Sequence, residues 1–189
     1  MVMNTNFDID WNTLPVPEDD GGTDHLGDSQ LPSVTLTSTA GTDTDLSKQA
    51  GLVVVYAYPM TGTPGVPLPD GWDLMPGARG CTPQSCAFRD HAAELADLGV
   101  SAVFGLSTQS PADQVEAASR LELPFSLLSD ESLRLAAAMR LPTFEVDGKT
   151  LLKRFTIVVR DGVVAKVFYP IFPPDSNASI VVKWLQDHA

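Results

Sequence analysis

Apolar residues recur along the chain with the period of a strand in some segments and with the period of a helix in others. Strands are expected at residues 34–37, 52–58, 101–107, 125–128, 151–159 and 163–169. Helices are expected over residues 82–99, 112–120, 131–140 and 176–187. Strands that alternate with helices, followed by two final strands and a helix, predict an α/β fold with a mixed central β-sheet flanked by helices.

Turn residues predict two hairpins. The stretch from Ala40 to Asp43 is rich in turn formers and leads into a short return strand at 45–47, which together with 34–37 makes an N-terminal β-hairpin. Near the other end, Asp161 and Gly162 separate two β-rich runs, as expected for a tight hairpin turn.

A long segment without helix or strand period separates the strand at 52–58 from the first helix. Residues 59–80 are dense in proline and glycine, and loops of this length inside compact domains are often functional. For the helix that follows, Thr82 is expected as the N-cap, Pro83 as the first helical residue and Gly99 as the end.

Composition divides the chain into an acidic extended arm at 1–32 and a body at 33–189. The net charge is −12 over 189 residues, and up to Gln49 a single base, Lys48, faces nine acidic residues. This balance argues against nucleic acid or an anionic membrane surface as a partner, because both require a basic patch. No apolar run reaches the length of a membrane span, and no signal peptide is visible, so a soluble cytoplasmic protein is expected.

The two cysteines, Cys81 and Cys86, are the candidates for chemistry. Cys81 immediately precedes the expected N-cap, and a helix N-terminus stabilises the thiolate, the reactive form of cysteine; Arg79 could add positive charge. In an intact helix a spacing of five separates Cα atoms by about 8–9 Å, whereas a disulfide needs them within about 7 Å. The pair can therefore close only if the first helical turn unwinds.

Spacing alone leaves two interpretations level, a redox pair or two ordinary cysteines. A metal site is less favoured, because two cysteines with His25, His91 and His188 do not form a recognisable four-ligand set. The spacing also differs from the Cys-x-x-Cys pair of disulfide exchangers.

Flanking segments favour the redox pair. The segments YPMTGTPG at 58–65 and CTPQSCAFRD at 81–90, with GLST at 105–108, LLSD at 127–130 and RFTIV at 154–158, occur in an order that covers residues 32–189. In these features the chain resembles a peroxiredoxin of the bacterioferritin-comigratory (Q) type.

The resemblance implies a thioredoxin-like fold and a peroxidase that needs no metal, haem or flavin. Cys81 would attack the peroxide and become a sulfenic acid, Cys86 would form an intrachain disulfide with it, and thioredoxin or a similar dithiol would reduce that disulfide. By position, Pro59, Thr63 and Arg154 would surround the reacting sulfur: the proline shields it, the threonine hydroxyl bonds thiolate and peroxide, and the arginine supplies a cation. A monomer or a homodimer is expected.

The chain departs from the family pattern at one place. Val66 stands where the family has its reactive cysteine, and residues 66–80 form an insertion before Cys81. Only a loop that folds back would keep Thr63 beside Cys81. The insertion is expected to form a flap or rim of the pocket, with Trp72 and Met75 supplying apolar contacts.

Two other functions remain open. The same sulfur chemistry would serve a peroxide sensor that passes oxidation to a partner, for which the acidic arm could be a docking segment. A thioredoxin-dependent disulfide reductase acting on proteins is a further alternative, against which the length of the resemblance argues.

Overall fold

A mixed seven-stranded sheet forms the centre of the molecule in the computed structural model, which describes residues 9–188. Strand β3 (Leu52–Ala57) lies between β4 (Val100–Ser107), to which it is parallel, and β8 (Phe155–Arg160), to which it is antiparallel. All six residues of β3 are buried, as the uninterrupted apolar run predicted.

Two hairpins complete the sheet at its edges. The remaining strands are β1 (Thr35–Ser38), β2 (Thr44–Asp45), β5 (Ser126–Ser129) and β9 (Val163–Phe168), and the order is β2-β1-β5-β4-β3-β8-β9. Both predicted hairpins, β1–β2 and β8–β9, are confirmed. Asp161 and Gly162 join the second one with φ of 48° and 81°, the positive values that a two-residue hairpin turn of this kind requires.

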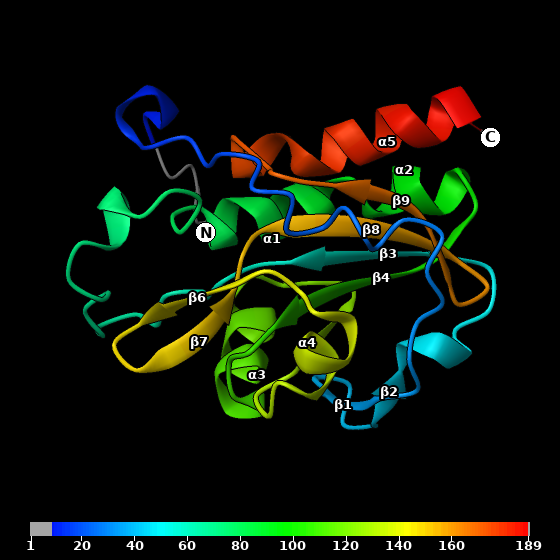
Figure 1. Cartoon of the computed structure of the whole chain (residues 1–189), viewed down its shortest axis with the longest axis horizontal. Helices are drawn as coiled ribbons and strands as arrows, with labels where there is room; N and C mark the ends of the chain where they lie inside the picture. The colour runs from blue at the N-terminus through cyan, green and yellow to red at the C-terminus, as the bar shows by residue number, and fades with distance from the viewer. Residues whose placement is uncertain (1–8, 189) are drawn as a thin grey trace.

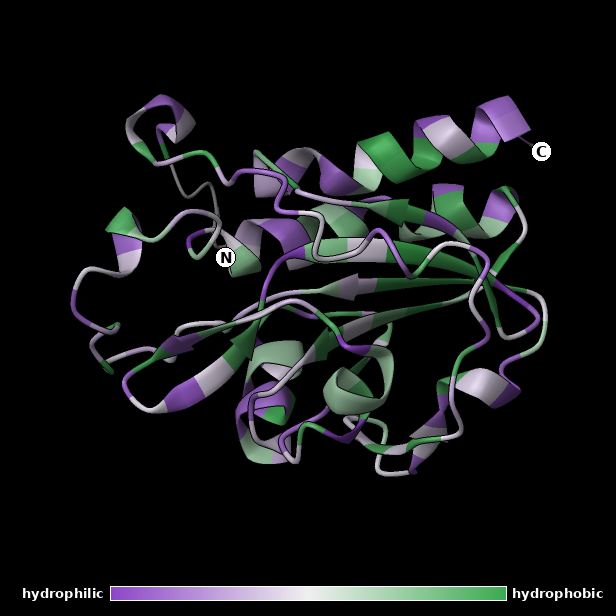
Figure 2. Ribbon diagram, in the orientation of Figure 1, coloured by the Kyte–Doolittle hydropathy of each residue, from purple (hydrophilic) through white to green (hydrophobic). Residues whose placement is uncertain are grey.

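Helices cover both faces of the sheet. Figure 1 shows the first two α-helices and the C-terminal helix along one side of the sheet. Figure 2 shows that apolar residues are concentrated in the strands between the layers. One core contains residues of α1 (Cys81–Asp90), α2 (Ala92–Asp97), α3 (Pro111–Arg120) and α5 (Asn177–His188). The other contains α4 (Arg134–Met139). Alternate residues of β3 serve the two cores, as the strand period requires.

The helix predicted over 82–99 is two helices. The chain turns at His91, whose φ of −97° and ψ of 5° are not helical. One ring nitrogen of His91 contacts the carbonyl of Ala87 at 2.9 Å, so the side chain competes for an acceptor of the last turn of α1. The turn lets Phe88 and Leu95, both fully buried, reach the same core.

The strand predicted over 151–159 is also divided. Residues up to Leu152 belong to β7 (Lys149–Leu152), which pairs with β6 (Thr143–Val146) in a separate hairpin that the sequence did not predict. Lys153 and Arg154 then leave the hairpin, and β8 begins at Phe155. The break allows the side chain of Arg154 to point into the protein, where it is 3% exposed.

Helix α4 is shorter than the predicted 131–140. The carboxylate of Asp130, 1% exposed, accepts hydrogen bonds from the backbone N–H groups of Leu135 and Ala136 at 3.0 and 2.7 Å. These bonds satisfy donors of the first helical turn, so the helix begins at Arg134.

The N-terminal segment lies along the body. Leu26 and Leu31 are buried in the core that contains α4, and Gln30 bridges to Val163 of β9. Further back, Trp11 donates a hydrogen bond through Nε1 to Asp175 at 2.9 Å, in the 3₁₀ turn η4 (Pro174–Ser176). Residues 1–8 of the predicted arm lie outside the described residues.

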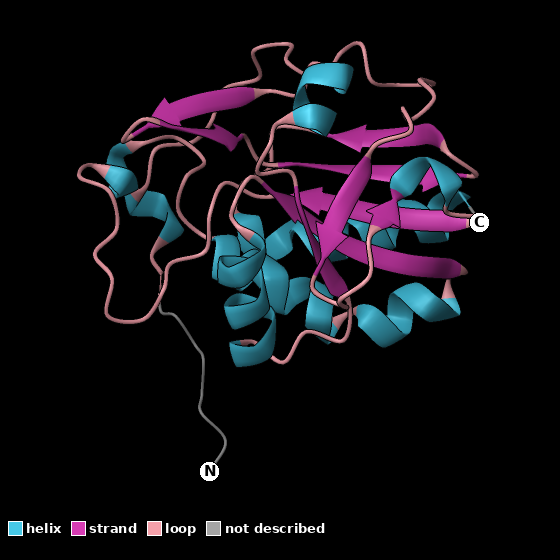
Figure 3. Ribbon diagram, turned by 90° about the horizontal axis from the view of Figure 1, so that it is seen from below, coloured by secondary structure: helices cyan, strands magenta, loops and turns pink. Residues whose placement is uncertain are grey.

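The insertion packs on the β6–β7 hairpin (Figure 3). Trp72, which begins the 3₁₀ turn η3 (Trp72–Leu74), is 4% exposed and forms a small third core with Ala78, Val146 and Leu151. Met75 packs against this core, so the apolar contacts expected of Trp72 and Met75 are present. None of the described helices combines the length and apolar character needed to cross a membrane.

Candidate active site

Cys81 is the first residue of α1, two positions further into the helix than predicted. The N-cap is Gly80 and not Thr82, and Pro83 is the third helical residue and not the first. Gly80 has a φ of +106°, and a Cβ there would lie 2.6 Å from Cγ of Pro174 and 2.9 Å from Cη2 of Trp11. Only glycine combines this backbone conformation with so close an approach, and that places Cys81 at the positive end of the helix.

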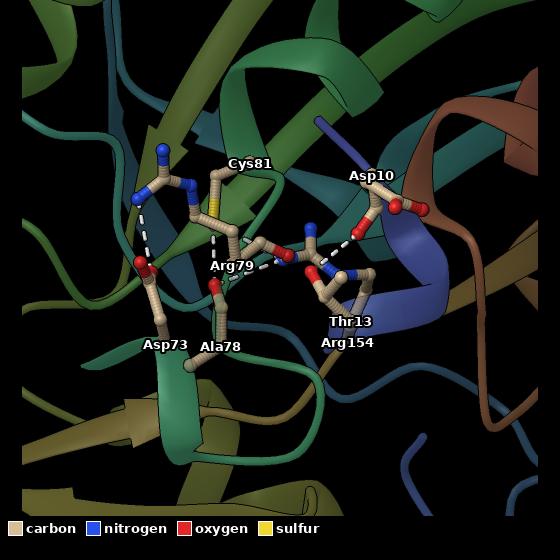
Figure 4. A network of polar contacts seen from close by, with 7 residues as sticks. All are labelled: Asp10, Thr13, Asp73, Ala78, Arg79, Cys81 and Arg154. Carbon is tan, nitrogen blue, oxygen red and sulfur yellow. Dashed lines mark hydrogen bonds and ion pairs between the residues drawn. The ribbon is translucent and has the colours of Figure 1, made fainter. Parts of the chain in front are cut away.

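The Cys81 thiol is buried beside a guanidinium group. Cys81 is 4% exposed, and its Sγ accepts a hydrogen bond from Nη2 of Arg154 at 3.3 Å (Figure 4). The thiol proton can be donated to the carbonyl of Ala78, 3.6 Å from Sγ. A permanent cation therefore lies in direct contact with the sulfur, and the thiolate is the form of cysteine that acts as a nucleophile.

Backbone carbonyls at the end of the insertion hold Arg154 in place. Its Nη2 lies 3.2 Å from each of the carbonyl oxygens of Gly77, Ala78 and Arg79. Because these carbonyls directly precede the helix, the insertion positions the arginine and the cysteine together.

A buried chain of amides supports the other side of the guanidinium. Arg154 Nη1 donates to Oε1 of Gln84, and Gln84 Nε2 donates to Oδ1 of Asn177 at 2.9 Å. Thr156 also donates to Asn177 Oδ1, at 2.7 Å. Sequence reasoning missed these three residues. Gln84 could have been predicted, because it follows Cys81 by three residues and residues three apart share a helix face. No local pattern links Asn177 or Thr156 to the site.

Thr63 and Cys81 line one cavity of about 270 Å³. The loop therefore folds back and brings Thr63 to the site, but no hydrogen bond joins its hydroxyl to Cys81 within the described part of the chain. Pro59 is buried two residues after the end of β3 and is not among the residues that line this cavity. Arg79 lines the cavity, and its Nη1 donates to Asp73 at 2.9 Å (Figure 4).

Cys86 lies within the same helix as Cys81, and both are free thiols. An intact α-helix separates residues five apart by about 8–9 Å between Cα atoms, beyond disulfide reach. Cys86 is half-buried, and burial raises the pKa of its thiol, although Arg89 and Arg120 act in the opposite direction. A disulfide between the two cysteines therefore requires the first turns of α1 to open.

No group of three or more histidine, cysteine, aspartate or glutamate side chains among residues 9–188 is arranged to hold a metal ion.

Comparison with known proteins identifies the family to which the chain is similar. Residues 26–183 match the Redoxin family. The chain is 35% identical over 157 residues to the chloroplastic peroxiredoxin Q of Populus jackii, covering 82% of this chain and 65% of the relative. It is 32% identical over 145 residues to peroxiredoxin Bcp of Escherichia coli, covering 75% of this chain and 82% of the relative.

Solved structures agree on the fold. The crystal structure of peroxidoxin BcpB from Mycobacterium tuberculosis superposes with a TM-score of 0.69 at 27% identity, over 87% of this chain and 98% of that one. This likeness and the mixed sheet with flanking helices confirm the predicted thioredoxin-like α/β fold.

Proposed function

The chain belongs to the Redoxin family and, within it, to the peroxiredoxins of the Q and Bcp type, and on that premise we propose that it is a thiol-dependent peroxidase that reduces hydrogen peroxide and organic hydroperoxides. One observation carries the proposal. Cys81 lines a cavity at the start of a ten-residue helix, and its Sγ lies 3.3 Å from Nη2 of Arg154.

In the first step the Cys81 thiolate attacks one oxygen of the peroxide. The S–O bond forms as the O–O bond breaks, the sulfur is oxidised to a sulfenic acid, and the other oxygen leaves and takes up a proton to become water or an alcohol. Arg154 donates hydrogen bonds toward the negative charge that moves from sulfur to the leaving oxygen. Thr63, on the cavity wall, is proposed to contact the peroxide, and Pro59 to shield the site from water.

In the second step Cys86 attacks the sulfenic sulfur of Cys81. An intrachain disulfide forms and water is released, after the start of α1 has opened. Thioredoxin or a similar dithiol then reduces the disulfide and is itself oxidised. A reducing compartment such as the cytoplasm would maintain that dithiol.

The test is peroxide turnover coupled to thioredoxin and thioredoxin reductase. The wild type should turn over many times, and Cys81→Ser should not turn over at all. Cys86→Ser should consume one equivalent of peroxide and then stop, and its intact mass should rise by one oxygen atom. The wild type treated with peroxide alone should instead lose two hydrogen atoms.

Each part of the proposal can fail separately. Turnover by Cys81→Ser would remove this residue from its role. Full turnover by Cys86→Ser would show that another thiol resolves the sulfenic acid. A wild type that is oxidised once and is not reduced again by any dithiol would be a peroxide sensor.

A further inference from the structure

The cavity at Cys81 has an unusual charge for this protein. Its charged lining residues are Arg79 and Arg120, and no acidic side chain lines it among the described residues. The chain as a whole carries a net charge of −12. The net negative charge of the molecule repels anions in general, whereas the two arginines attract a negatively charged group that enters this cavity.

The rest of the cavity is largely apolar. Its apolar lining residues include Met60, Val66, Leu68 and Trp72, and Cys81 lines it as well. Val66, Leu68, Trp72 and also Arg79 belong to the 66–80 insertion. The insertion therefore supplies both an apolar wall and one of the two cations.

Both arginines have partners at the surface, Asp73 exposed and Glu116 partly exposed. Arg79 pairs with Asp73 at 2.9 Å, where the two side chains are 36% and 57% exposed. Arg120 holds Glu116 through two contacts, from Nε to Oε1 at 2.6 Å and from Nη2 to Oε2 at 3.2 Å, and its Nη2 also donates to the carbonyl of Gly62 at 3.0 Å. A guanidinium has five N–H donors, and these contacts use only Nη1 of Arg79 and only Nε and Nη2 of Arg120. Each can take a further acceptor or exchange its partner.

Arg154 is placed differently. Its Nη2 contacts the Cys81 sulfur and three carbonyl oxygens, and its Nη1 is bonded to Gln84. These contacts hold Arg154 at the reacting sulfur. Arg79 and Arg120 are therefore the arginines of the cavity that can bind a group elsewhere on the substrate.

We propose that Arg79 and Arg120 form an anion subsite of the substrate cavity, and that the preferred substrates are organic hydroperoxides that carry a carboxylate. The peroxide group reaches Cys81, the apolar part lies against Trp72 and Leu68, and the carboxylate binds the two guanidinium groups. This inference rests on the proposed peroxidase function.

The test compares cumene hydroperoxide bearing a para-carboxylate with the methyl ester of the same compound. The measured quantity is the acid-to-ester ratio of kcat/KM, in which effects common to both substrates cancel. The wild type should prefer the acid, and added salt should reduce the preference because it screens exposed charges.

Substitutions of opposite sign sharpen the test. Arg79→Gln and Arg120→Gln should each lower the ratio about threefold to fivefold, the range of one exposed ion pair. Asp73→Asn should raise the ratio, because it frees Arg79 from its partner. Arg134→Gln, an exposed arginine that does not line the cavity, is the matched control and should leave the ratio unchanged.

The subsite is overturned if neither arginine substitution changes the ratio, or if Asp73→Asn lowers it. Failure of the peroxidase function would look different. In that case the wild type would reduce neither the acid nor the ester, whereas loss of the subsite alone would leave ester reduction in place.

Discussion

Arg154 joins the chemistry of the site to the packing around it. Its guanidinium touches the Cys81 sulfur, the carbonyls of residues 77–79 and the amide of Gln84. The neighbouring Lys153 reaches in the other direction and bonds Asp20 of the N-terminal segment. The change of direction at these two residues therefore places the cation of Arg154 inside the molecule and the cation of Lys153 at its surface.

Replacing Arg154 with methionine should slow the attack on peroxide about 100-fold, the cost of removing one preorganised donor to developing negative charge. The rate constant with hydrogen peroxide, measured by stopped flow, tests this. Arg160→Met, at the exposed far end of β8, should leave the rate unchanged. A loss of less than threefold in a folded Arg154→Met protein would contradict the role given to Arg154.

The pH dependence of the second step should follow Cys86. Burial raises the pKa of its thiol in the folded protein, so near neutral pH only a small part is thiolate. Disulfide formation should therefore accelerate as the pH rises from about 6 to about 9, across the usual range of a thiol. The rate of sulfenic acid loss, measured at each pH after one equivalent of peroxide, gives the profile. A rate that falls with rising pH would contradict this prediction.

At the scale of elements, the start of α1 is the meeting point of three segments. The end of the insertion leads into it, the turn η4 lies against Gly80, and Trp11 of the N-terminal segment contacts the same glycine. The part of α1 that must open for disulfide formation is thus covered by parts of the chain that are distant in sequence.

Gly80→Ala should destabilise the fold more than Gly99→Ala does. Both glycines have positive φ, +106° and +87°, so both substitutions add backbone strain of about 1–3 kcal/mol. At Gly99 a Cβ meets nothing within 4 Å, whereas at Gly80 it would collide with Pro174 and Trp11. Free energies of unfolding from urea titration should differ by the cost of that collision. Equal losses of unfolding free energy in the two variants would contradict this prediction, because Pro174 and Trp11 would then move aside without an energetic penalty.

At the scale of the whole molecule, an acid-sensitive contact holds the N-terminal segment to the body. Asp20 accepts hydrogen bonds from Nζ of Lys153 at 2.5 Å and from the hydroxyl of Tyr169 at 2.6 Å. These partners, Lys153 above all, hold the pKa of Asp20 well below its usual range. A carboxyl whose pKa is lowered by folding stabilises the folded state above its ordinary pKa and loses this effect as the pH falls.

The N-terminal segment should therefore loosen as the pH falls below about 4, the usual range of a carboxyl group. Limited proteolysis at a series of pH values, with an acid-active protease, measures how quickly the segment is cut. Asp20→Asn should be cut faster than the wild type already at higher pH and should show a weaker pH dependence. Asp19→Asn, the neighbouring acid, should behave as the wild type does; the same acceleration in both variants would point to net charge instead.

Local patterns were sufficient for much of the fold. Ser110 caps α3 through a hydrogen bond from the N–H of Asp113, and Pro111 follows it as the first helical residue. The run at 101–107 and the turn at Asp161 and Gly162 were equally clear. In each case the atoms that decide the structure lie within a few residues of one another, so the sequence contains them directly. Cys81, Cys86 and Arg154 were predicted as site residues through the segments around them, and the structure brings Cys81 and Arg154 into contact.

Contacts between distant segments decided the rest. The continuous β-rich run at 151–159 carries no mark of the change of direction at Arg154, which depends on carbonyls some 75 residues earlier. Gln84, Asn177 and Thr156 meet only because α1, α5 and β8 pack together. The insertion was visible in the sequence as a departure from a pattern. That it lines the cavity at Cys81 with Trp72 and Arg79 follows from its packing on β6–β7, since a loop without local periodicity takes its shape from the surface it buries.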